Sequence, residues 1–343
     1  MQILSSALRS ICDDFAIDLG TCNTLLYRKG IGLVCDEPSV VAMRWSASGG
    51  PHVLAVGSQA KKMLGRTPSS VTVTRPLRDG VIVDVDAAEV LLRHFLNKAL
   101  DSRVSRRLVI CVSSGLTSLE RRAIEETVQR VGIRELHLVA QLIASAIGAG
   151  LPINEPLGNM IMDIGGGTTE LGVISLGQVV FSQRLRVGGD AIDEAICEQI
   201  KKNYDLEIGS GTAESIKLMI GSVKPDAERN VLLIGGRDVV TGRPKTVPIS
   251  NKEICETLKN WAHPLIEAVR TVLQNTPPDL TSDIADRGIT LTGGGALLRN
   301  LAALLREEVG LPFRLANDPL KCAVMGAGQL VEHSSVLRQM ALS

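Results

Sequence analysis

Aromatic residues are scarce in this chain, with four Phe, two Tyr and two Trp among 343 residues. The hydrophobic cores must therefore be aliphatic, and a stacking platform for single-stranded nucleic acid is not expected. Neither sign of charge is in excess, because 37 Lys and Arg residues balance 37 Asp and Glu residues. This balance argues against a general nucleic-acid binder and against a strongly charged protein that adsorbs to membranes.

Signals of several other protein classes are also missing. No apolar run approaches the roughly 20 residues that a membrane span requires. The N-terminus has neither a basic region nor a long apolar one, so we predict no secretory signal. Seven cysteines form no C-x-x-C pair and no metal-ligand spacing with the five histidines. Apolar runs such as LVICV around Cys111 instead indicate buried thiols in a reducing cytoplasm.

The chain lacks the two commonest nucleotide-binding motifs as well. No G-x-x-x-x-G-K-[ST] occurs, and no G-x-G-x-x-G follows a predicted strand. A nucleotide site in this chain must therefore have a different architecture.

The most informative segment that is present spans residues 159–176, NMIMDIGGGTTELGVISL, and predicts a strand, a tight turn and a second strand. Three consecutive glycines let backbone N–H groups converge on an anion, and Thr168 and Thr169 add hydroxyl donors. Asp163 stands at the end of the first strand, where a carboxylate can hold the water shell of Mg²⁺. A Gly-rich hairpin turn without a ligand is the alternative for this segment taken alone.

The same pattern occurs earlier in the chain. Residues 15–27, FAIDLGTCNTLLY, contain an apolar strand, then Asp18, Gly20 and Thr21, then a second strand. Asp18 and Asp163 are 145 residues apart. A pattern that recurs at domain-sized spacing predicts two related halves, each offering a phosphate-binding hairpin to one cleft.

Strands alternate with helices around both hairpins, so we predict an α/β fold with two related domains. The predicted division is an amphipathic segment at 1–12, domains at 13–150 and 151–330 with an insert near 211–250, and a C-terminal tail or helix at 331–343. A third glycine-rich passage, residues 293–295, follows a predicted strand and precedes a predicted helix at 296–308. It either exposes helix N-terminal amides to a ligand or only allows a tight turn.

Together these motifs resemble those of a known superfamily. IDLGT (17–21), MDIGGGTTE (162–170), GGDAIDEAI (188–196), AESIK (213–217) and LTGGGALLRN (291–300) occur in the order seen in the actin/heat-shock-chaperone/sugar-kinase ATPases. Within that superfamily the chain resembles the MreB family of bacterial actin homologues over nearly its whole length. The closer resemblance is carried by DEPSVVA (36–42), RPLRDGVI (75–82), ERRAI (120–124) and VISLGQVV (173–180).

The resemblance implies an actin-like ATPase fold with ATP and Mg²⁺ bound between two domains. It assigns phosphate contacts to Thr21, Cys22 and Asn23 and to Gly165, Gly166, Gly167 and Thr168. It assigns the organisation of Mg²⁺, through water, to Asp18 and Asp163. It places Glu214 and Lys217 at the ribose and adenine, Gly293, Gly294, Gly295 and Ala296 at the nucleoside pocket, and Asp190 and Asp193 on the adenosine side.

The chain departs from the family pattern at residues 140–142 and at residue 22. The family has Glu-Glu-Pro where this chain has Ala140–Gln141–Leu142, and its second Glu places the attacking water. Gln141 can orient a water molecule but cannot take its proton, so we predict a catalytic role for Gln141 together with slow hydrolysis. Cys22 stands where the family has Ala, a change that keeps the backbone donor.

The resemblance favours a cytoskeletal ATPase whose ATP form assembles head to tail into open filaments. In the family such filaments lie under the cell membrane and guide cell-wall synthesis during elongation, which maintains rod shape. Two alternatives from other classes stay open. One is a nucleotide-gated scaffold with little or no hydrolysis, and the other is a small-molecule kinase, which would need a carboxylate base that Gln141 does not provide.

Membrane contact would depend on residues 1–11, because the loop at 102–107 lacks the apolar pair that some relatives insert into the membrane. Ile3, Leu4, Ala7, Leu8 and Ile11 fall on one helical face. The sequence leaves three fates open for this segment: a disordered tail, a helix packed on its own domain, or an amphipathic membrane foot. If the segment is a membrane foot, we predict a cytoplasmic protein that associates with the membrane as filaments.

Overall fold

The computed structural model describes residues 13–46, 49–99, 105–225 and 230–342. The predicted membrane segment at 1–11 lies outside the described residues. The chain forms two compact units and passes from one to the other four times. The first unit comprises Met1–Pro156, Ile174–Val179 and Leu320–Ser343, and the second comprises Leu157–Val173 and Val180–Pro319. Each unit has its own aliphatic core built on a five-stranded sheet.

The sheet of the first unit has the strand order β10-β9-β1-β2-β3. Its strands are β1 (Asp13–Leu19), β2 (Asn23–Arg28), β3 (Gly32–Pro38), β9 (Ser105–Val112) and β10 (Glu135–Ala140). β1, β9 and β10 run parallel, whereas β2 is antiparallel to both of its neighbours. Phe15 and Ile17 point into the core on one face, and Cys111 on the other face donates its thiol to the Ala323 carbonyl at 3.6 Å.

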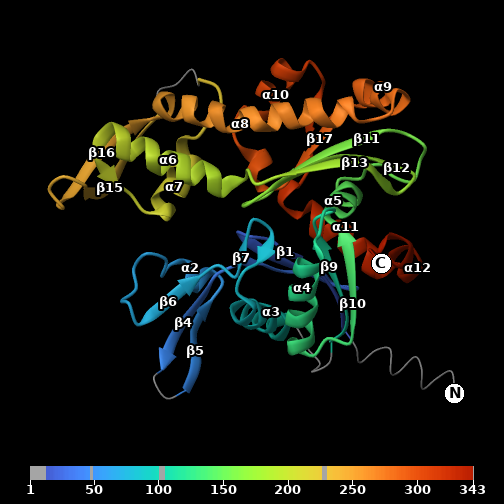
Figure 1. The fold of residues 1–343 in the computed structure, drawn as a ribbon, viewed down its shortest axis with the longest axis horizontal. Coiled ribbons are helices and arrows are strands. Elements are labelled where there is room, and N and C mark those ends of the chain that lie inside the picture. The colour runs from blue at the N-terminus through green and yellow to red at the C-terminus, as the bar shows by residue number, and fades with distance from the viewer. Residues whose placement is uncertain (1–12, 47–48, 100–104, 226–229, 343) are drawn as a thin grey trace. The chain divides into compact units, whose positions relative to one another are not determined.

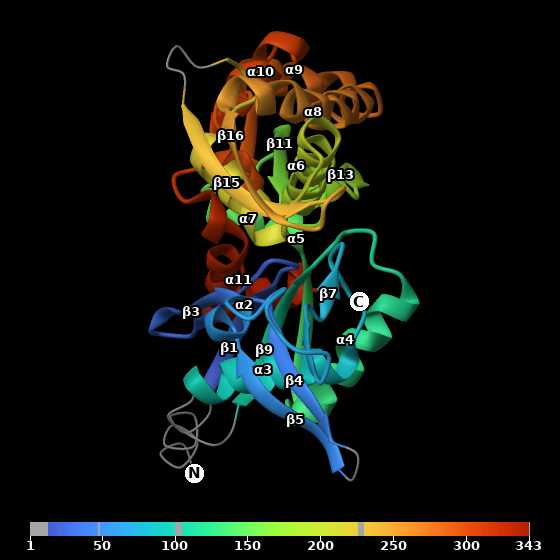
Figure 2. The ribbon, with the colours of Figure 1, turned by 90° about the vertical axis from the view of Figure 1, so that its left-hand side faces the viewer.

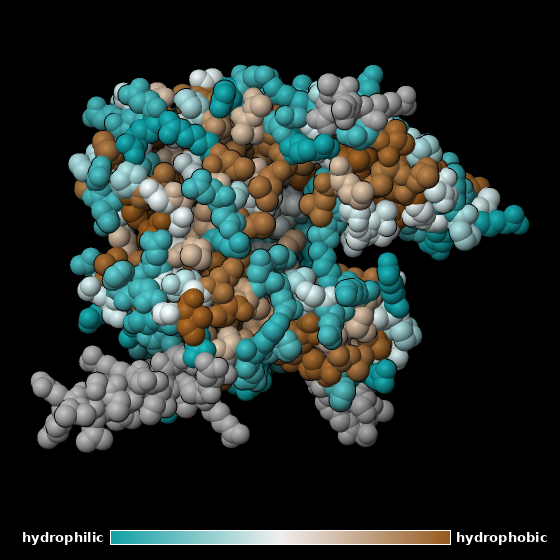
Figure 3. Space-filling model, turned by 180° about the vertical axis from the view of Figure 1, so that it is seen from behind, coloured by the Kyte–Doolittle hydropathy of each residue, from teal (hydrophilic) through white to brown (hydrophobic). Residues whose placement is uncertain are grey.

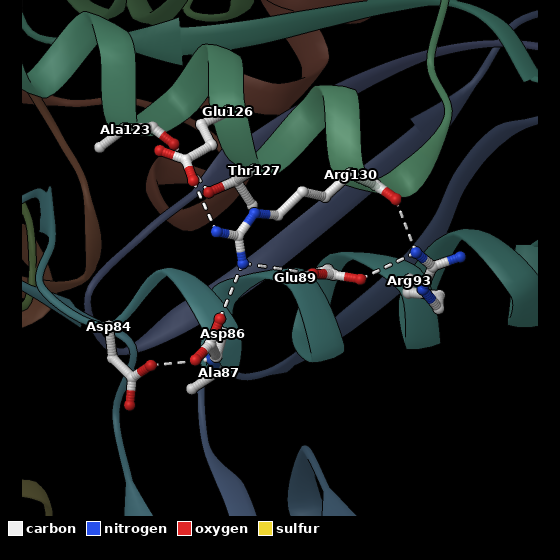
Figure 4. Close-up of polar contacts among 9 residues, drawn as sticks. All are labelled: Asp84, Asp86, Ala87, Glu89, Arg93, Ala123, Glu126, Thr127 and Arg130. Atoms are coloured by element: carbon white, nitrogen blue, oxygen red, sulfur yellow. Dashed lines mark hydrogen bonds and ion pairs between the residues drawn. The ribbon is translucent and has the colours of Figure 1, made fainter. Parts of the chain in front are cut away.

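Two helices, α3 (Val85–Ala99) and α4 (Ser118–Val131), cover the first of these faces (Figure 1). α4 begins with a capping box, in which Thr117 Oγ1 accepts from the Glu120 amide at 3.2 Å, and ends at Gly132 with φ of 89°. The two helices are joined at the surface through Arg130, whose guanidinium lies 2.7 Å from Asp86 of α3 and 2.5 Å from Glu126 of α4 (Figure 4). Exposed pairs of this kind contribute little stability, so the buried apolar contacts hold α3 and α4 in place.

The other face carries α5 (Gln141–Gly148) and α11 (Cys322–Glu332). These helices approach so closely that a Cβ on Gly326 would lie 1.8 Å from the Ala144 carbonyl oxygen. A Cβ on Gly148 would lie 1.9 Å from the Cys322 carbonyl oxygen. Only glycine at both positions allows this backbone-to-backbone contact, and the contact fixes the helix that starts at Gln141.

The last described residues return to the sheet. After α12 (Ser334–Met340), Ala341 forms a β-bridge with Val139 and the Leu342 amide donates to the Leu138 carbonyl at 2.8 Å. This contact covers part of the outer edge of β10.

A smaller sheet extends from the first unit, and its β4–β5 hairpin is long (Figure 2). It comprises β4 (Val41–Ser46), β5 (Gly49–Val56) and β6 (Val71–Thr74), with α2 (Ser58–Lys61) beside it. The short hairpin of β7 (Leu77–Arg78) and β8 (Val81–Ile82) follows, and its turn is Asp79–Gly80.

The second unit repeats the arrangement of the first. Its sheet has the order β13-β12-β11-β17-β18, with strands β11 (Asn159–Ile164), β12 (Thr169–Ser175), β13 (Gln178–Leu185), β17 (Ile289–Thr292) and β18 (Phe313–Leu315). β11, β17 and β18 are parallel neighbours, as are β1, β9 and β10. The equivalent order of the strands agrees with the two related halves predicted from the repeated motif.

Helices α8 (Asn251–Gln274), α9 (Pro278–Arg287) and α10 (Leu301–Val309) lie on one side of this sheet (Figure 1). α6 (Gly189–Tyr204) and α7 (Ser210–Ile220) pack with a three-stranded sheet of β14 (Leu206–Glu207), β15 (Val231–Asp238) and β16 (Pro244–Ser250). Apolar residues reach the surface over β15 (Figure 3), where Val231 and Leu233, at alternate positions of the strand, are both exposed.

The sequence predicts a helix over 296–308, but the structure divides this segment. Residues Gly294–Leu297 form a 3₁₀ turn, and α10 begins only at Leu301. Asn300 has φ of 64°, and its side chain donates to Ser222 Oγ at 2.9 Å. The tertiary contact with residues 221–223 therefore interrupts a pattern that would otherwise continue as one helix.

In the parts of the chain that the structure describes, no helix combines the length and the apolar character needed to cross a bilayer.

The close contact between α5 and α11 can be tested with one methyl group. We expect Gly326→Ala to lower the free energy of unfolding by about 3 kcal/mol, because the new Cβ overlaps the Ala144 carbonyl. The control is Gly211→Ala in α7, where a Cβ meets nothing within 4 Å, and this change should be neutral or stabilise by up to about 1 kcal/mol. Chemical denaturation of both variants makes the comparison, and equal effects would contradict the contact.

Candidate functional site

The predicted site residues of the first unit begin with the turn between β1 and β2. The Gly20 amide donates to the Asn23 carbonyl at 3.1 Å, which closes a tight turn containing Thr21 and Cys22. A Cβ on Gly20 would lie 2.6 Å from the same carbonyl oxygen, so this turn requires glycine. Asp18 precedes the turn near the end of β1 and is half-buried.

Two segments from elsewhere in the unit brace this turn. Ser39 Oγ donates to the Gly20 carbonyl at 2.6 Å, and the Ser39 amide donates to the Cys22 carbonyl at 2.9 Å. On the other side, Thr21 Oγ1 accepts from the Gly80 amide at 3.0 Å. Sequence reasoning did not identify Ser39 or Gly80 as part of the site. The Asp79–Gly80 pair could have indicated a turn at Gly80, because Asp-Gly is typical of a two-residue hairpin turn. Both residues have positive φ in the structure.

A guanidinium also reaches the first turn. Arg75 Nη1 lies 3.8 Å from Cys22 Sγ. This contact brings a permanent positive charge to the loop that is predicted to bind phosphate, where cations are favourable. Cys22 is only partly buried, unlike Cys35, Cys111, Cys255 and Cys322.

Gln141 lies on the same face of the sheet as Asp18. Ile17 pairs with Ile110, and Val139 pairs with Cys111. Because side chains alternate along a strand, Asp18, Cys111 and Val139 project from one face. This is the face that carries α11 and α5, the helix that Gln141 begins. Gln141 is the first residue of α5, and among the described residues no side chain caps this helix start.

The second unit contains the same turn. The Gly165 amide donates to the Thr168 carbonyl at 2.8 Å, so the bonded pair corresponds to Gly20 and Asn23 shifted by 145 residues. Asp163 precedes Gly165 by two residues, as Asp18 precedes Gly20. The motif repeat is therefore also a repeat of backbone geometry.

The second turn is packed against the start of α6. The Gly189 amide donates to the Gly165 carbonyl at 3.0 Å, and the Asp190 amide donates to the Gly166 carbonyl at 2.7 Å. A Cβ on Gly188 would lie 2.5 Å from the Gly166 carbonyl oxygen. These bonds bring the predicted phosphate residues Gly165–Thr168 together with the predicted adenosine-side residue Asp190.

The third glycine-rich passage meets Asp163. Strand β17 pairs with β11 so that Thr292 lies opposite Asp163, and Gly293 follows with φ of 80°. A Cβ on Gly293 would lie 2.7 Å from Asp163 Oδ1 and 2.4 Å from the Ile164 carbonyl oxygen. Glycine is needed here for both its φ and its size. Residues Gly294, Gly295 and Ala296 continue into the 3₁₀ turn, so the passage is a tight turn and not the start of a long helix.

Lys217 links α7 to α6. Its Nζ lies 2.8 Å from Asp193 Oδ1 and donates to the Gly189 carbonyl at 3.0 Å. Burial, with smaller contributions from the nearby Glu214 and Asp190 carboxylates, raises the pKa of Asp193 to about 6, although Lys217 acts to lower it. Burial thus outweighs the ion pair in its effect on the pKa, but the carboxylate is still mostly ionised at neutral pH. Glu214 lies one helical turn before Lys217 and is half-buried.

The carboxylates suit a magnesium ion that is held mostly by water and phosphate. Mg²⁺ keeps several waters and usually binds through one or two carboxylates together with substrate phosphates. Each turn offers one such carboxylate, Asp18 or the buried Asp163. Across the described residues there is no cluster of three or more His, Cys, Asp or Glu side chains that could hold a metal by themselves.

The predicted site residues thus form two groups, one in each unit. The first unit holds Asp18, Thr21, Cys22, Asn23 and Gln141. The second holds Asp163, Gly165, Gly166, Gly167, Thr168, Asp190, Asp193, Glu214, Lys217, Gly293, Gly294, Gly295 and Ala296.

Comparison with known proteins gives one consistent result. Residues 12–339 match the family model described as MreB/Mbl protein. The chain is 48% identical to the cell shape-determining protein MreB of Escherichia coli strain K12 over 324 residues, which is 93% of each chain. It is 43% identical to the cell shape-determining protein Mbl of Bacillus subtilis strain 168, covering 96% of this chain and 99% of that protein.

Comparison with solved structures gives the same result as the sequence comparison. MreB5 of Spiroplasma citri bound to AMPPNP has a TM-score of 0.89 at 35% identity, covering 96% of this chain and 98% of its own. The same protein bound to ADP has a TM-score of 0.88. Structural likeness at this level over nearly the whole length shows an actin-like fold.

The paired aspartates can be tested by removing charge without changing size. We expect Asp163→Asn and Asp18→Asn each to weaken Mg²⁺-dependent ATP binding about 10- to 100-fold, because each removes a charged hydrogen-bond acceptor for the metal's waters. Asp286→Asn, on the exposed side of α9, is the control and should bind as the unchanged protein does. Titration with and without Mg²⁺ measures the effect. If both site variants keep the affinity and the Mg²⁺ dependence, the aspartates have no role in metal binding.

Proposed function

The chain belongs to the MreB/Mbl family, and we propose that it is a nucleotide-binding, filament-forming actin homologue that determines cell shape. Its relatives in E. coli and B. subtilis are named for cell-shape determination, and MreB5 of S. citri binds ADP and AMPPNP. For this chain, ATP and ADP are the proposed nucleotides.

The observation that carries the proposal is the repeated turn. Each unit presents a closed glycine turn two residues after an aspartate, at Gly20 after Asp18 and at Gly165 after Asp163. Such turns direct backbone amides to an anion, so each of the two turns suits a phosphate group of a nucleotide. The Arg75 guanidinium adds a positive charge at the first turn.

Asp18 and Asp163 are the proposed holders of Mg²⁺. When bound, the ion neutralises negative charge on the phosphates. The two carboxylates accept hydrogen bonds from its waters, and the lack of a side chain at Gly293 leaves room for the Asp163 carboxylate. Glu214 and Lys217 are proposed to contact the nucleoside, with Lys217 held in place by Asp193.

Gln141 is proposed to orient the water that attacks the γ-phosphate. It lies on the same sheet face as Asp18, and α5 is fixed from behind by α11. A neutral amide aligns a water but does not accept its proton, so hydrolysis is slow and ATP filaments are long-lived. The absence of a base at this position also favours a nucleotide-gated scaffold as the second candidate, and it disfavours a small-molecule kinase.

Filament formation under nucleotide control is tested by sedimentation. We expect the full chain to pellet with Mg·ATP and with AMPPNP, and to pellet less with ADP, because ATP favours the assembled state. Asp163→Asn is the matched control and should lose the nucleotide dependence. Equal pelleting in all nucleotide states would remove nucleotide control, and no pelleting in any state would contradict filament formation.

The role of Gln141 is tested by single-turnover phosphate release. Gln141→Glu should raise the rate at least about tenfold, because general-base help is typically worth 10²–10⁴-fold. Gln141→Ala should lower the rate below that of the unchanged protein, and both variants should bind ATP normally. Gln129→Glu on exposed α4 is the control for added charge. Phosphate release from the unchanged protein separates a slow ATPase from a scaffold, and three equal rates at position 141 would leave Gln141 without a catalytic role.

The proposal extends to the inner membrane surface and to the cell-wall synthesis machinery as partners of the filament. Residues 1–11 carry the apolar face described above and only one basic residue, Arg9. A single such segment binds lipid weakly, but a filament presents many copies, and avidity multiplies their attachment.

Deleting residues 1–11 should release filaments from liposomes and leave ATP-dependent assembly intact. Flotation of assembled protein with vesicles that contain anionic lipid measures the first effect, and sedimentation without lipid measures the second. Full-length protein is the reference for both. If the shortened chain floats with lipid as well as the reference, the membrane contact lies elsewhere.

A further inference from the structure

Ser113 stands at the carboxyl end of β9, the central strand of the three parallel strands β10, β9 and β1. Val112, the last residue of β9, pairs with Ala140, the last residue of β10. The next residues along the two strands are Ser113 and Gln141. Neighbouring strands are roughly 5 Å apart, so these two residues leave the sheet side by side.

Ser113 also lies between two candidate residues in the strand order. Cys111 pairs with Val139 and lies one position beyond Ile110, the partner of Ile17. Cys111 is therefore on the face of Asp18 and Val139. Ser113 follows Cys111 by two residues and Gln141 follows Val139 by two residues, each just beyond the end of its strand. The strand order places Ser113 between Asp18 on one side and Gln141 on the other.

The Ser113 hydroxyl has no partner of its own in the unit. Its Oγ is shielded from solvent and makes no hydrogen bond to any of the described residues. The Ser113 carbonyl, by contrast, accepts from the Leu116 amide at 3.2 Å, so the backbone turn does not depend on the side chain. A buried hydroxyl without a partner is unfavourable, and such groups in a native protein call for an explanation.

We infer that Ser113 Oγ hydrogen-bonds the attacking water that Gln141 orients. This inference depends on the proposed ATPase function. A hydroxyl offers one donor and two acceptor positions, so it can hold a water while Gln141 holds the same water from the start of α5. Two anchors that directly follow neighbouring strands restrict the water more than one flexible glutamine side chain does, which favours the in-line geometry.

The chemical step needs no proton from Ser113. The water oxygen forms a bond to the γ-phosphorus, and the bond from that phosphorus to the β,γ-bridging oxygen breaks. ADP leaves with the electron pair of the broken bond, and the water's proton passes to the released phosphate or to solvent. Ser113 keeps its own proton throughout, which agrees with a site that aligns water without a base.

The test is single-turnover phosphate release from Mg·ATP by the full chain and three serine variants. Ser113→Ala should lower the rate about five- to tenfold, the effect of one lost hydrogen bond, with ATP affinity unchanged within twofold. Ser113→Thr keeps the hydroxyl and should restore the rate to within twofold. Ser118→Ala, at an exposed position at the start of α4, is the matched control and should match the unchanged protein.

Two further measurements separate a water-holding role from a structural one. Combining Ser113→Ala with Gln141→Ala should lower the rate little beyond Gln141→Ala alone, because both side chains hold one water. The melting temperature of nucleotide-free Ser113→Ala should equal or exceed that of the unchanged protein, since its hydroxyl has no bond to lose. A lower melting temperature would reveal a structural hydrogen bond and would overturn the inference.

The outcomes also distinguish this inference from the function on which it rests. If the unchanged protein releases phosphate and Ser113→Ala releases it equally fast, the ATPase stands and Ser113 has no role in it. If the unchanged protein releases no phosphate, the ATPase and the role of Ser113 both fall.

Discussion

Close contact between backbone segments, at distances that no side chain would permit, underlies both groups of site residues. Gly20 folds back on Asn23, Gly188 lies against Gly166, and Gly293 lies against Asp163 and Ile164. In each case a Cβ would fall within 2.7 Å of a backbone or carboxylate atom. Glycine is therefore required by the space available, and the backbone amides of the turns are held in place by other backbone atoms. A site built in this way changes little when surface side chains change.

The parts of the site that could be predicted from sequence are those formed locally. Asp18 and Asp163 each lie within a dozen residues of the strands and glycines that define their turns, so one short pattern contains the whole feature. The bracing of the first turn could not be predicted in this way, because Ser39 and Gly80 are 19 and 59 residues away from their partners. Their hydrogen bonds follow from strand pairing across the unit, which a local pattern does not contain.

The fold shows the same limit. The strands of the two repeated hairpins follow from their apolar runs and lie where the sequence predicts them. The error at 296–308 arose where periodicity was satisfied but a distant segment intervened: Ser222 bridges to Arg299, and Arg299 Nε donates to the Gly221 carbonyl at 2.9 Å. The sequence also did not show how the chemistry of the site residues differs between the two units. One unit presents hydroxyls, amides and an arginine around its turn, whereas the other presents a buried carboxylate–lysine pair.

The bridge between Ala341 and Val139 joins the end of the described chain to β10, which is about 200 residues earlier in the sequence. β10 is an edge strand, and it leads directly into Gln141. A fluorescent protein or affinity tag joined after residue 343 would begin two residues beyond Leu342, whose amide bonds to the Leu138 carbonyl. We expect a bulky label at this position to disturb the edge of the strand that leads into Gln141, and a tagged chain would then report its own nucleotide turnover poorly. Insertion within an exposed loop far from β10 avoids this mechanical link.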